Sequence, residues 1–309
     1  MTGRPKPRSA ELSPALRLRS EAARLASPVP ALLIAAQRIA QTIIQGTHGR
    51  RTAGVGEEFW QYRLYTSGDP AQRIDWRKSA RTHKVLVREN EWVAVNTLWL
   101  WADGGRGMAF RSHLAPVAKA SRAMLIAMTL AVLAQRAGER IGLIGAPFAA
   151  GHTHATLGRI AAALAAESSP NLPPNARLNR FSSAVLVSDF LEPVDGLAAK
   201  LTLLAGQVQR GHLVQIADPA EEAFPYRGRI EFAEMGGAHR IVFGRVETLR
   251  DDYQLTYRRH RDAVRDLARR LGWTFTVHHT DQPPHRLLMA LHALIAEGRH
   301  RVALAKGAA

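Results

Sequence analysis

Aspartates at the ends of predicted strands are the first residues of this chain that could do chemistry. Asp103, Asp189 and Asp218 each stand at the end of an apolar run typical of a buried strand. In doubly wound sheets, binding sites gather where strands reach their carboxyl edge. A hard cation such as Mg²⁺ prefers about six oxygen ligands, and several can be waters, so these carboxylates could form part of such a site. Alternatively, they accept hydrogen bonds from loop N–H groups or pair with Arg106.

A second group of charged residues lies in the stretch from Gly54 to Trp101. Its members are Glu57, Glu58, Asp69, Asp75 and Lys78. Two carboxylates and a lysine could hold a metal ion and polarise a phosphate, as a metal-dependent nuclease requires. Each acid also has a basic residue nearby, as an ion-paired structural module would need; these bases are Arg63, Arg73, Arg77 and Arg81. We favour the structural interpretation and predict that the chain has no catalytic residue.

Histidine and cysteine offer little for metal or nucleophilic chemistry. The chain has no cysteine, which excludes a thiolate nucleophile and a thiolate metal site. His152 and His154 lie in a predicted loop, and His278 and His279 are neighbours in a predicted strand, where successive side chains point to opposite faces. His48 is expected to be a surface loop histidine. We therefore predict no zinc site.

The elements that must position these residues alternate along the 309 residues of the chain. Repeated strand–helix units predict an α/β fold, in which a doubly wound, mainly parallel sheet has helices on both faces. The predicted strands are 96–102, 141–145, 184–187, 213–217 and 273–278. The predicted helices are 28–45, 116–137, 156–167, 194–210, a helix capped by Thr248 that ends near Gly272, and 284–297. Residues 228–232 and 239–243 predict a hairpin on the edge of the sheet.

Ordered motifs fill the stretch from Gly54 to Trp101. They read GVGEEF at residues 54–59, RLYTSGD at 63–69, RIDWRKSAR at 73–81 and VRE at 87–89. Turn-forming residues at 67–70 and the alternation of residues 85–88 predict a small, ion-paired, β-rich module. The pattern resembles the bacterial family catalogued as domain of unknown function 58, and the resemblance continues to about Thr280. We predict a signature and partner-binding set of Glu57, Glu58, Phe59, Arg63, Tyr65, Gly68, Asp69, Arg73, Asp75, Trp76, Arg77, Ser79, Arg81, Arg88 and Glu89.

The resemblance implies that a von Willebrand factor A-like domain follows this module. In that fold a D-x-S-x-S loop after the first strand, a threonine from a later loop and an aspartate after a central strand hold Mg²⁺, and one position is left for a partner's carboxylate. Asp103 matches the start of the loop, but Gly105 and Gly107 stand at its serine positions, with Arg106 between them. The resemblance therefore implies a degenerate metal ion-dependent adhesion site (MIDAS).

The other candidate ligands of this degenerate site come from later in the chain. Asp189 matches the later aspartate, and either Thr153 or Thr156 could supply the threonine. Two hydroxyl ligands are missing, and we therefore predict no cofactor and no stable metal. Weak Mg²⁺ binding through Asp103, Asp189 and water is the alternative.

The chain is strongly basic, with a formal net charge of +16 and an isoelectric point near 11.2. An anionic partner such as nucleic acid is therefore a first hypothesis, but the basic residues are dispersed, so we expect such binding to be weak and non-specific. One stripe is predicted on the helix that follows Thr248: Arg258, Arg261, Arg265 and Arg269. The apolar tracts predict no membrane span, and the absence of cysteine fits a cytoplasmic protein.

Four parts are predicted: a basic mobile arm (1–27), an N-terminal helix and linker (28–50), the β-rich signature module (51–93) and the α/β domain (94–309). The module holds Trp60, Tyr62, Tyr65 and Trp76, more large aromatics than a small β element can bury. Aromatics with arginine are typical of interface centres. We predict a non-enzymatic adaptor, and the resemblance implies a MoxR-type AAA+ ATPase as partner in assembly or remodelling of client proteins. The alternative is a nucleic-acid-binding protein or a metal-dependent nuclease.

Overall fold

A five-stranded, fully parallel sheet forms the centre of the computed structural model. Its strand order is β4-β3-β5-β6-β9, and each neighbouring pair is parallel. The strands are β3 (Thr97–Ala102), β4 (Arg140–Leu143), β5 (Ser182–Ser188), β6 (Arg210–Ala217) and β9 (Thr274–His279). The structure describes residues 28–47, 59–66, 74–82, 84–90, 96–166, 171–180, 182–233 and 240–307. The predicted α/β class with a mainly parallel sheet is confirmed.

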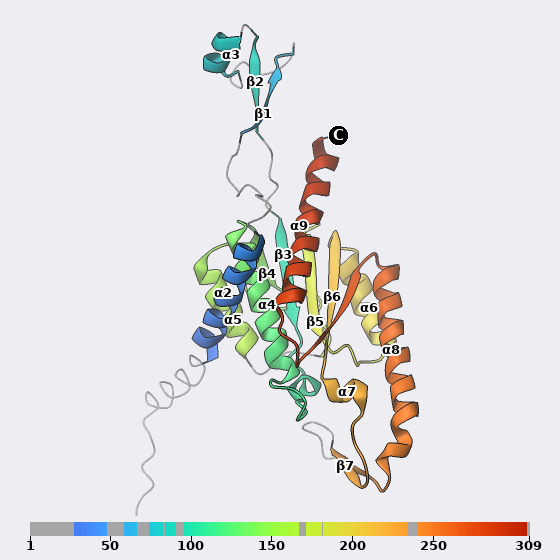
Figure 1. Cartoon of the computed structure of the whole chain (residues 1–309). Coiled ribbons are helices and arrows are strands. Elements are labelled where there is room, and N and C mark those ends of the chain that lie inside the picture. The colour runs from blue at the N-terminus through green and yellow to red at the C-terminus, as the bar shows by residue number, and fades with distance from the viewer. Residues whose placement is uncertain are drawn as a thin grey trace, which may run out of the picture.

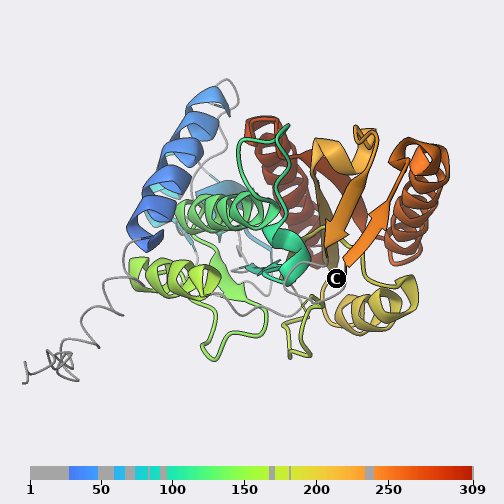
Figure 2. The ribbon, with the colours of Figure 1, turned by 90° about the horizontal axis from the view of Figure 1, so that it is seen from below.

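Helices cover both faces of the sheet, so that the domain has three layers (Figures 1 and 2). One face packs against α2 (Pro28–Thr47), α4 (Lys119–Arg136), α5 (His154–Ala165) and α9 (His285–Gly307). The other face packs against α6 (Val194–Ala205) and α8 (Arg250–Arg270). Successive residues of β3 alternate between these two cores, and all six are buried. A strand buried on both faces reads as a continuous apolar run, which is why the sequence revealed it.

Two glycines make room for large aromatic side chains on the face under α6 and α8. A Cβ atom at Gly142 would lie 2.2 Å from the Trp99 ring, and one at Gly211 would lie 1.9 Å from the Trp273 ring. Both distances are too short for any real contact, so a larger residue at either position would displace the ring. The two tryptophans therefore occupy the space that the glycines leave free.

A small module lies outside the three layers (Figure 1). In it, β1 (Phe59–Leu64) pairs antiparallel with β2 (Leu86–Asn90), and α3 (Trp76–Thr82) contacts β2. The helix was not predicted, because its seven residues are too few for a helical period to show in the sequence. The predicted turn at 67–70 and the predicted arm at 1–27 lie outside the described residues.

The region after β6 holds short elements that the sequence showed only in part. β7 (Ile230–Ala233) and β8 (Arg240–Phe243) form the predicted antiparallel hairpin. This hairpin is a separate two-stranded sheet, which corrects its predicted place on the edge of the large sheet. The short α7 (Pro219–Ala223) and the 3-10 helix η2 (Arg106–Ala109) were not predicted, because neither is long enough to show a period.

The longer helices follow the predicted ranges except at some ends. α8 begins at Arg250 and not at the predicted cap, because Thr248 lies in the 3-10 helix η3 (Val246–Leu249) and its hydroxyl donates to the Arg245 carbonyl. α6 ends at Ala205, before the predicted end at 210, where β6 begins. Within the described ranges, no helix combines the length and the apolar character needed to cross a bilayer.

Candidate functional site

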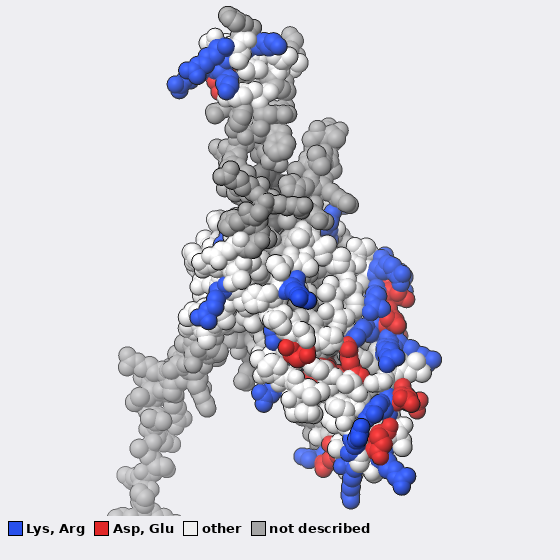
Figure 3. Space-filling model, viewed as in Figure 1, with Lys and Arg blue, Asp and Glu red and all other residues white. Residues whose placement is uncertain are grey.

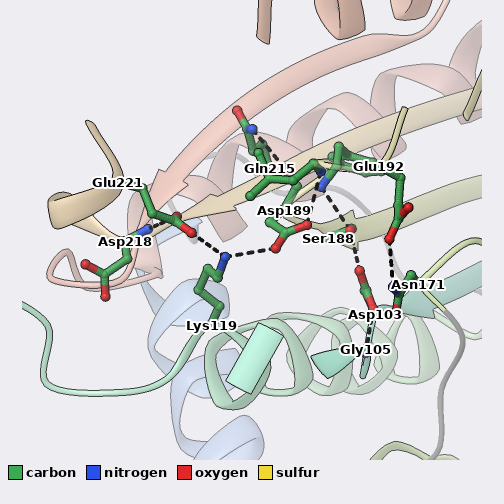
Figure 4. A network of polar contacts seen from close by, with 12 residues as sticks. Asp103, Gly105, Lys119, Asn171, Ser188, Asp189, Glu192, Gln215, Asp218 and Glu221 are labelled. Carbon is green, nitrogen blue, oxygen red and sulfur yellow. Dashed lines mark hydrogen bonds and ion pairs between the residues drawn. The ribbon is translucent and has the colours of Figure 1, made fainter. Parts of the chain in front are cut away.

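Three neighbouring strands deliver acidic residues to one edge of the sheet (Figure 4). Asp103 follows β3, Asp189 follows β5 and Asp218 follows β6, and all three are buried. Parallel strands end at the same edge, which is why residues so far apart in sequence meet here. The three carboxylates nevertheless have separate sets of partners.

Asp103 is held by hydrogen bonds from two donors. Its Oδ1 accepts a bond of 2.7 Å from the Gly105 N–H, and its Oδ2 accepts one of 2.6 Å from the Ser188 hydroxyl. The residue is 4% exposed. Burial raises the pKa of Asp103 to about 6, against the lowering effect of these two hydrogen bonds. Asp103 therefore accepts a hydrogen bond from an N–H group of its own loop, as one of the two alternatives in the sequence analysis expected.

Asp189 is paired with Lys119, the first residue of α4. The Lys119 Nζ lies 2.8 Å from Asp189 Oδ2 and 2.5 Å from Glu221 Oε1, and the lysine is 1% exposed. Burial opposes the charged ammonium, but the charges of Asp189 and Glu221 outweigh it, so the pKa of Lys119 is raised. The lysine is therefore a buried cation at the centre of this edge.

Asp218 and Glu221 form a capping box at the start of α7. Asp218 Oδ1 accepts a 2.9 Å hydrogen bond from the Ala220 N–H, and Glu221 Oε2 accepts one of 2.9 Å from the Asp218 N–H. The other Asp218 oxygen accepts a 2.8 Å bond from the Ser112 N–H. These bonds satisfy backbone donors at a helix start and fix Glu221 so that it faces Lys119.

The polar network continues from Asp189 toward α8. The Gln215 side chain donates to the Asp189 carbonyl at 2.9 Å and accepts from Arg261 Nε at 2.8 Å. Arg261 also pairs with Glu222, whose Oε1 lies 3.0 Å from His279 Nε2. The hydrogen bond from His279, together with Arg261, lowers the pKa of Glu222 to about 2. An extended, mutually paired network therefore supports the loop after β5.

The predicted threonines lie at the other end of the sheet. Gly151 pairs antiparallel with Ile141 on β4, so the chain has turned back before it reaches Thr153. Thr153 then caps α5, where its hydroxyl accepts a 3.2 Å hydrogen bond from the Thr156 N–H. The structure therefore does not bring Thr153 or Thr156 to Asp103. Within the described ranges, no group of three or more His, Asp and Glu side chains is placed to hold a metal ion.

The space beside the two glycines of the loop after Asp103 is occupied by side chains from other loops. A Cβ atom at Gly105 would lie 1.9 Å from the Asn171 Oδ1, and one at Gly107 would lie 3.3 Å from Asp189 Oδ2. Arg106, which was named as an alternative partner of these aspartates, is exposed. The buried cation beside Asp189 is Lys119.

Asp75 of the signature is a helix cap. Its Oδ1 accepts a 2.9 Å hydrogen bond from the Lys78 N–H, and its Oδ2 accepts one of 3.0 Å from the Tyr62 hydroxyl. The Ser79 hydroxyl donates to the Asp75 carbonyl at 2.7 Å and accepts from the Leu86 N–H at 2.9 Å. These bonds attach α3 to β1 and β2, and an aspartate cap at a helix start is typical.

The other signature residues have different placements. Glu57, Glu58, Gly68, Asp69 and Arg73 lie outside the described residues. Phe59 and Arg63 lie on β1, and Arg88 and Glu89 lie on β2. Ser79 is buried, whereas Tyr65, Trp76, Arg77 and Arg81 are exposed. The signature therefore contributes both the internal bonds of the module and part of its surface.

The predicted arginine stripe on α8 is interleaved with acidic residues (Figure 3). Arg265 pairs with Asp262, and Arg269 pairs with Asp266. Arg261 pairs with Glu222, and Arg258 donates to the neutral Gln254 side chain at 3.4 Å. Much of the positive charge on this face is therefore balanced locally.

Two residues of the carboxyl edge were missed by the sequence analysis. Glu221 had a local signal, because Asp218-Pro219-Ala220-Glu221 has the spacing of a capping box. Lys119 had none, because its partners Asp189 and Glu221 are 70 and 102 residues away in sequence.

The fold and this edge define the chain as an α/β protein with a parallel, helix-covered sheet. A family model described as "Protein of unknown function DUF58" matches residues 61–263, and the chain belongs to this family. It is 25% identical over 278 residues to the uncharacterized protein Mb1516 of Mycobacterium bovis, which covers 81% of this chain and 83% of the relative. The uncharacterized protein Rv1480 of Mycobacterium tuberculosis matches to the same extent. No solved structure matches the chain significantly.

Proposed function

We propose that this chain is a non-enzymatic adaptor whose small module binds a partner protein. The observation that carries the proposal is the outer surface of α3. Trp76 is 65% exposed, and Tyr65, just after β1, is 40% exposed. Arg77 and Arg81 are exposed on the same helix as Trp76. We call Trp76, Arg77 and Arg81 the α3 surface, and Tyr65 is a further exposed aromatic of the same module. Exposed aromatics together with arginine are enriched at interface centres.

The polar groups inside the module support binding rather than catalysis. Both carboxylate oxygens of Asp75 accept hydrogen bonds, one from the Lys78 N–H and one from Tyr62. The Lys78 ammonium lies 5.2 Å from the centre of the Tyr62 ring, as a cation–π contact. Asp75 and Lys78 thus have structural partners that hold α3 in place, which favours an adaptor over a nuclease.

The arrangement of the large sheet favours a von Willebrand factor A-like domain behind this module. β3 is the first strand of the large sheet in sequence, and it lies between β4 and β5. Asp103 and Asp189 follow the adjacent strands β3 and β5 at the carboxyl edge. This matches the positions of the two aspartates in such a domain. We therefore propose an interaction domain in which the acidic residues at the carboxyl edge of the sheet are already paired within the protein.

We further propose that the partner is a MoxR-type AAA+ ATPase and that the pair acts in assembly or remodelling of client proteins. The support is the signature, because proteins that it resembles are commonly associated with such ATPases. The two exposed arginines suit an acidic surface on the ATPase. The adaptor would then bring the ATPase to its client.

Titration of a purified MoxR-type ATPase from the same genome tests the proposal. Trp76→Ala should weaken binding about tenfold or more, because a buried tryptophan at an interface centre is a typical hot spot. Leu203→Ala on α6 is the matched control, since Leu203 is also an exposed apolar residue. Wild-type affinity in the Trp76→Ala protein would refute the proposal that the α3 surface is the binding interface. Failure of the wild type to bind would remove the ATPase as partner.

A further inference from the structure

The Lys119 ammonium lies where acidic side chains from the segments after β5 and β6 converge (Figure 4). Asp189 follows β5, and Glu221 lies in α7. Both carboxylates contact the same Nζ atom, at 2.8 Å and 2.5 Å. The Phe110 ring centre is 5.8 Å away. The lysine therefore occupies a buried position between carboxylate oxygens, which is the setting of a bound cation.

The second oxygens of these two acids are also satisfied. Asp189 Oδ1 accepts a 3.2 Å hydrogen bond from the Leu191 N–H, and Glu221 Oε2 accepts one of 2.9 Å from the Asp218 N–H. Backbone donors fix both carboxylates so that one oxygen of each faces the ammonium. The geometry is therefore held by the loops and not by the lysine alone.

The Mg²⁺ site that the family resemblance implies does not fit these residues. Gly105 and Gly107 carry no hydroxyl, and Asn171 fills the space beside Gly105. Both Asp103 oxygens accept hydrogen bonds, from Gly105 and Ser188. A divalent ion beside Asp189 would also have to displace a buried ammonium that already pairs with it. The residues present therefore do not form the implied Mg²⁺ site, and the cation beside Asp189 is the Lys119 ammonium.

We propose that Lys119 is a built-in cation that takes the place of a divalent metal ion at this edge of the sheet. Removing its side chain should uncover a site for Ca²⁺ or Mn²⁺ between Asp189 and Glu221, since hard cations prefer carboxylate oxygens. The wild-type protein then needs no metal to fold. Its edge also offers no open coordination position to a partner's carboxylate, so partner binding should survive a chelator.

Thermal unfolding of Lys119→Ala, with and without Ca²⁺ or Mn²⁺, tests this proposal. Either ion should raise the Tm of Lys119→Ala by several degrees, because a ligand that binds only the folded state stabilises it. The wild type and Lys200→Ala should not respond; Lys200 is an exposed lysine whose ammonium contacts Asn175 at 2.9 Å. Calorimetry should detect metal binding to Lys119→Ala that is lost in Lys119→Ala/Asp189→Asn.

A folding failure of the variant remains informative. If Lys119→Ala folds only with added metal, recovery of folded protein by Ca²⁺ or Mn²⁺ supports the proposal. Lys119→Met/Glu221→Gln removes one charge of each sign. This variant should fold without metal, and Ca²⁺ or Mn²⁺ should not change its Tm. The proposal is overturned if metal stabilises the wild type through Asp189. It is also overturned if Ca²⁺ and Mn²⁺ neither stabilise nor recover Lys119→Ala.

Discussion

The carboxyl edge of the sheet and the α3 surface place their charged residues in opposite settings. At the edge, Lys119 is buried and paired with Asp189 and Glu221. On α3, Trp76 and Arg81 are exposed. Removing one partner of a buried pair is costly, whereas exposed pairs contribute little to stability. The difference teaches that charged residues at the edge stabilise the fold, while those on α3 are available to another molecule.

Replacing Lys119 by methionine should have the largest effect. The change keeps most of the side-chain volume but leaves two buried carboxylates without their cation, which costs about 3–5 kcal/mol of unfolding free energy. Urea unfolding of the full chain measures the loss. Lys200→Met is the control and should change stability by less than about 0.5 kcal/mol. An unchanged midpoint for Lys119→Met would remove the contrast between the two regions.

Asp103 should make the edge, but not the α3 surface, sensitive to pH. Burial raises its pKa from 3.8 to about 6. A raised folded-state pKa contributes stability that is present below the unfolded pKa and is lost as the pH rises through the folded pKa. The wild type should therefore lose up to about 3 kcal/mol relative to Asp103→Asn between about pH 4 and pH 7. Urea unfolding at a series of pH values measures this difference, and a constant difference would contradict it.

Arg81→Glu should separate binding from folding. The side chain is exposed, so the unfolding midpoint should not change. Reversing its charge should weaken binding to the ATPase about tenfold at low salt, with a smaller loss at high salt because exposed charges are screened. Arg269→Glu on α8 is the control, since that arginine pairs with Asp266. Equal binding by both variants would show that the α3 surface is not the interface.

Asp75→Ala should have the smallest effect, and it should be confined to the module. It removes the cap of α3 and the Tyr62 hydrogen bond, which together contribute about 1–2 kcal/mol. Amide hydrogen exchange should quicken in α3 and stay unchanged in the large sheet. An Asp75→Asn protein that folds but loses a nuclease activity would instead make the carboxylate catalytic.

The sheet was predictable and the module was only partly so. β3 and β5 are buried along their whole length, so each reads as an apolar run. α3 has seven residues and is held by the Asp75 cap and the Ser79 bridge to Leu86, and these contacts give no periodic signal. Short elements that depend on particular hydrogen bonds are hidden from pattern analysis.

The candidate site was predictable where it depends on strand ends. Asp103 and Asp189 were placed at the edge because parallel strands end together. Thr153 was misplaced because the direction of the chain after β4 depends on the Gly151 to Ile141 pairing, which no local pattern reveals. Lys119 was missed because its charge is explained only by residues that are distant in sequence.

The close approach of Trp273 to Gly211 couples the two positions during sequence divergence. No side chain fits at 211 while the indole occupies its present place, because the added Cβ would lie 1.9 Å from the ring. A change at 211 alone would therefore be disfavoured, but the same change could be accepted after Trp273 had become smaller. Homologous chains should accordingly show small and large residues exchanged between these positions, as a record of the order in which the substitutions occurred.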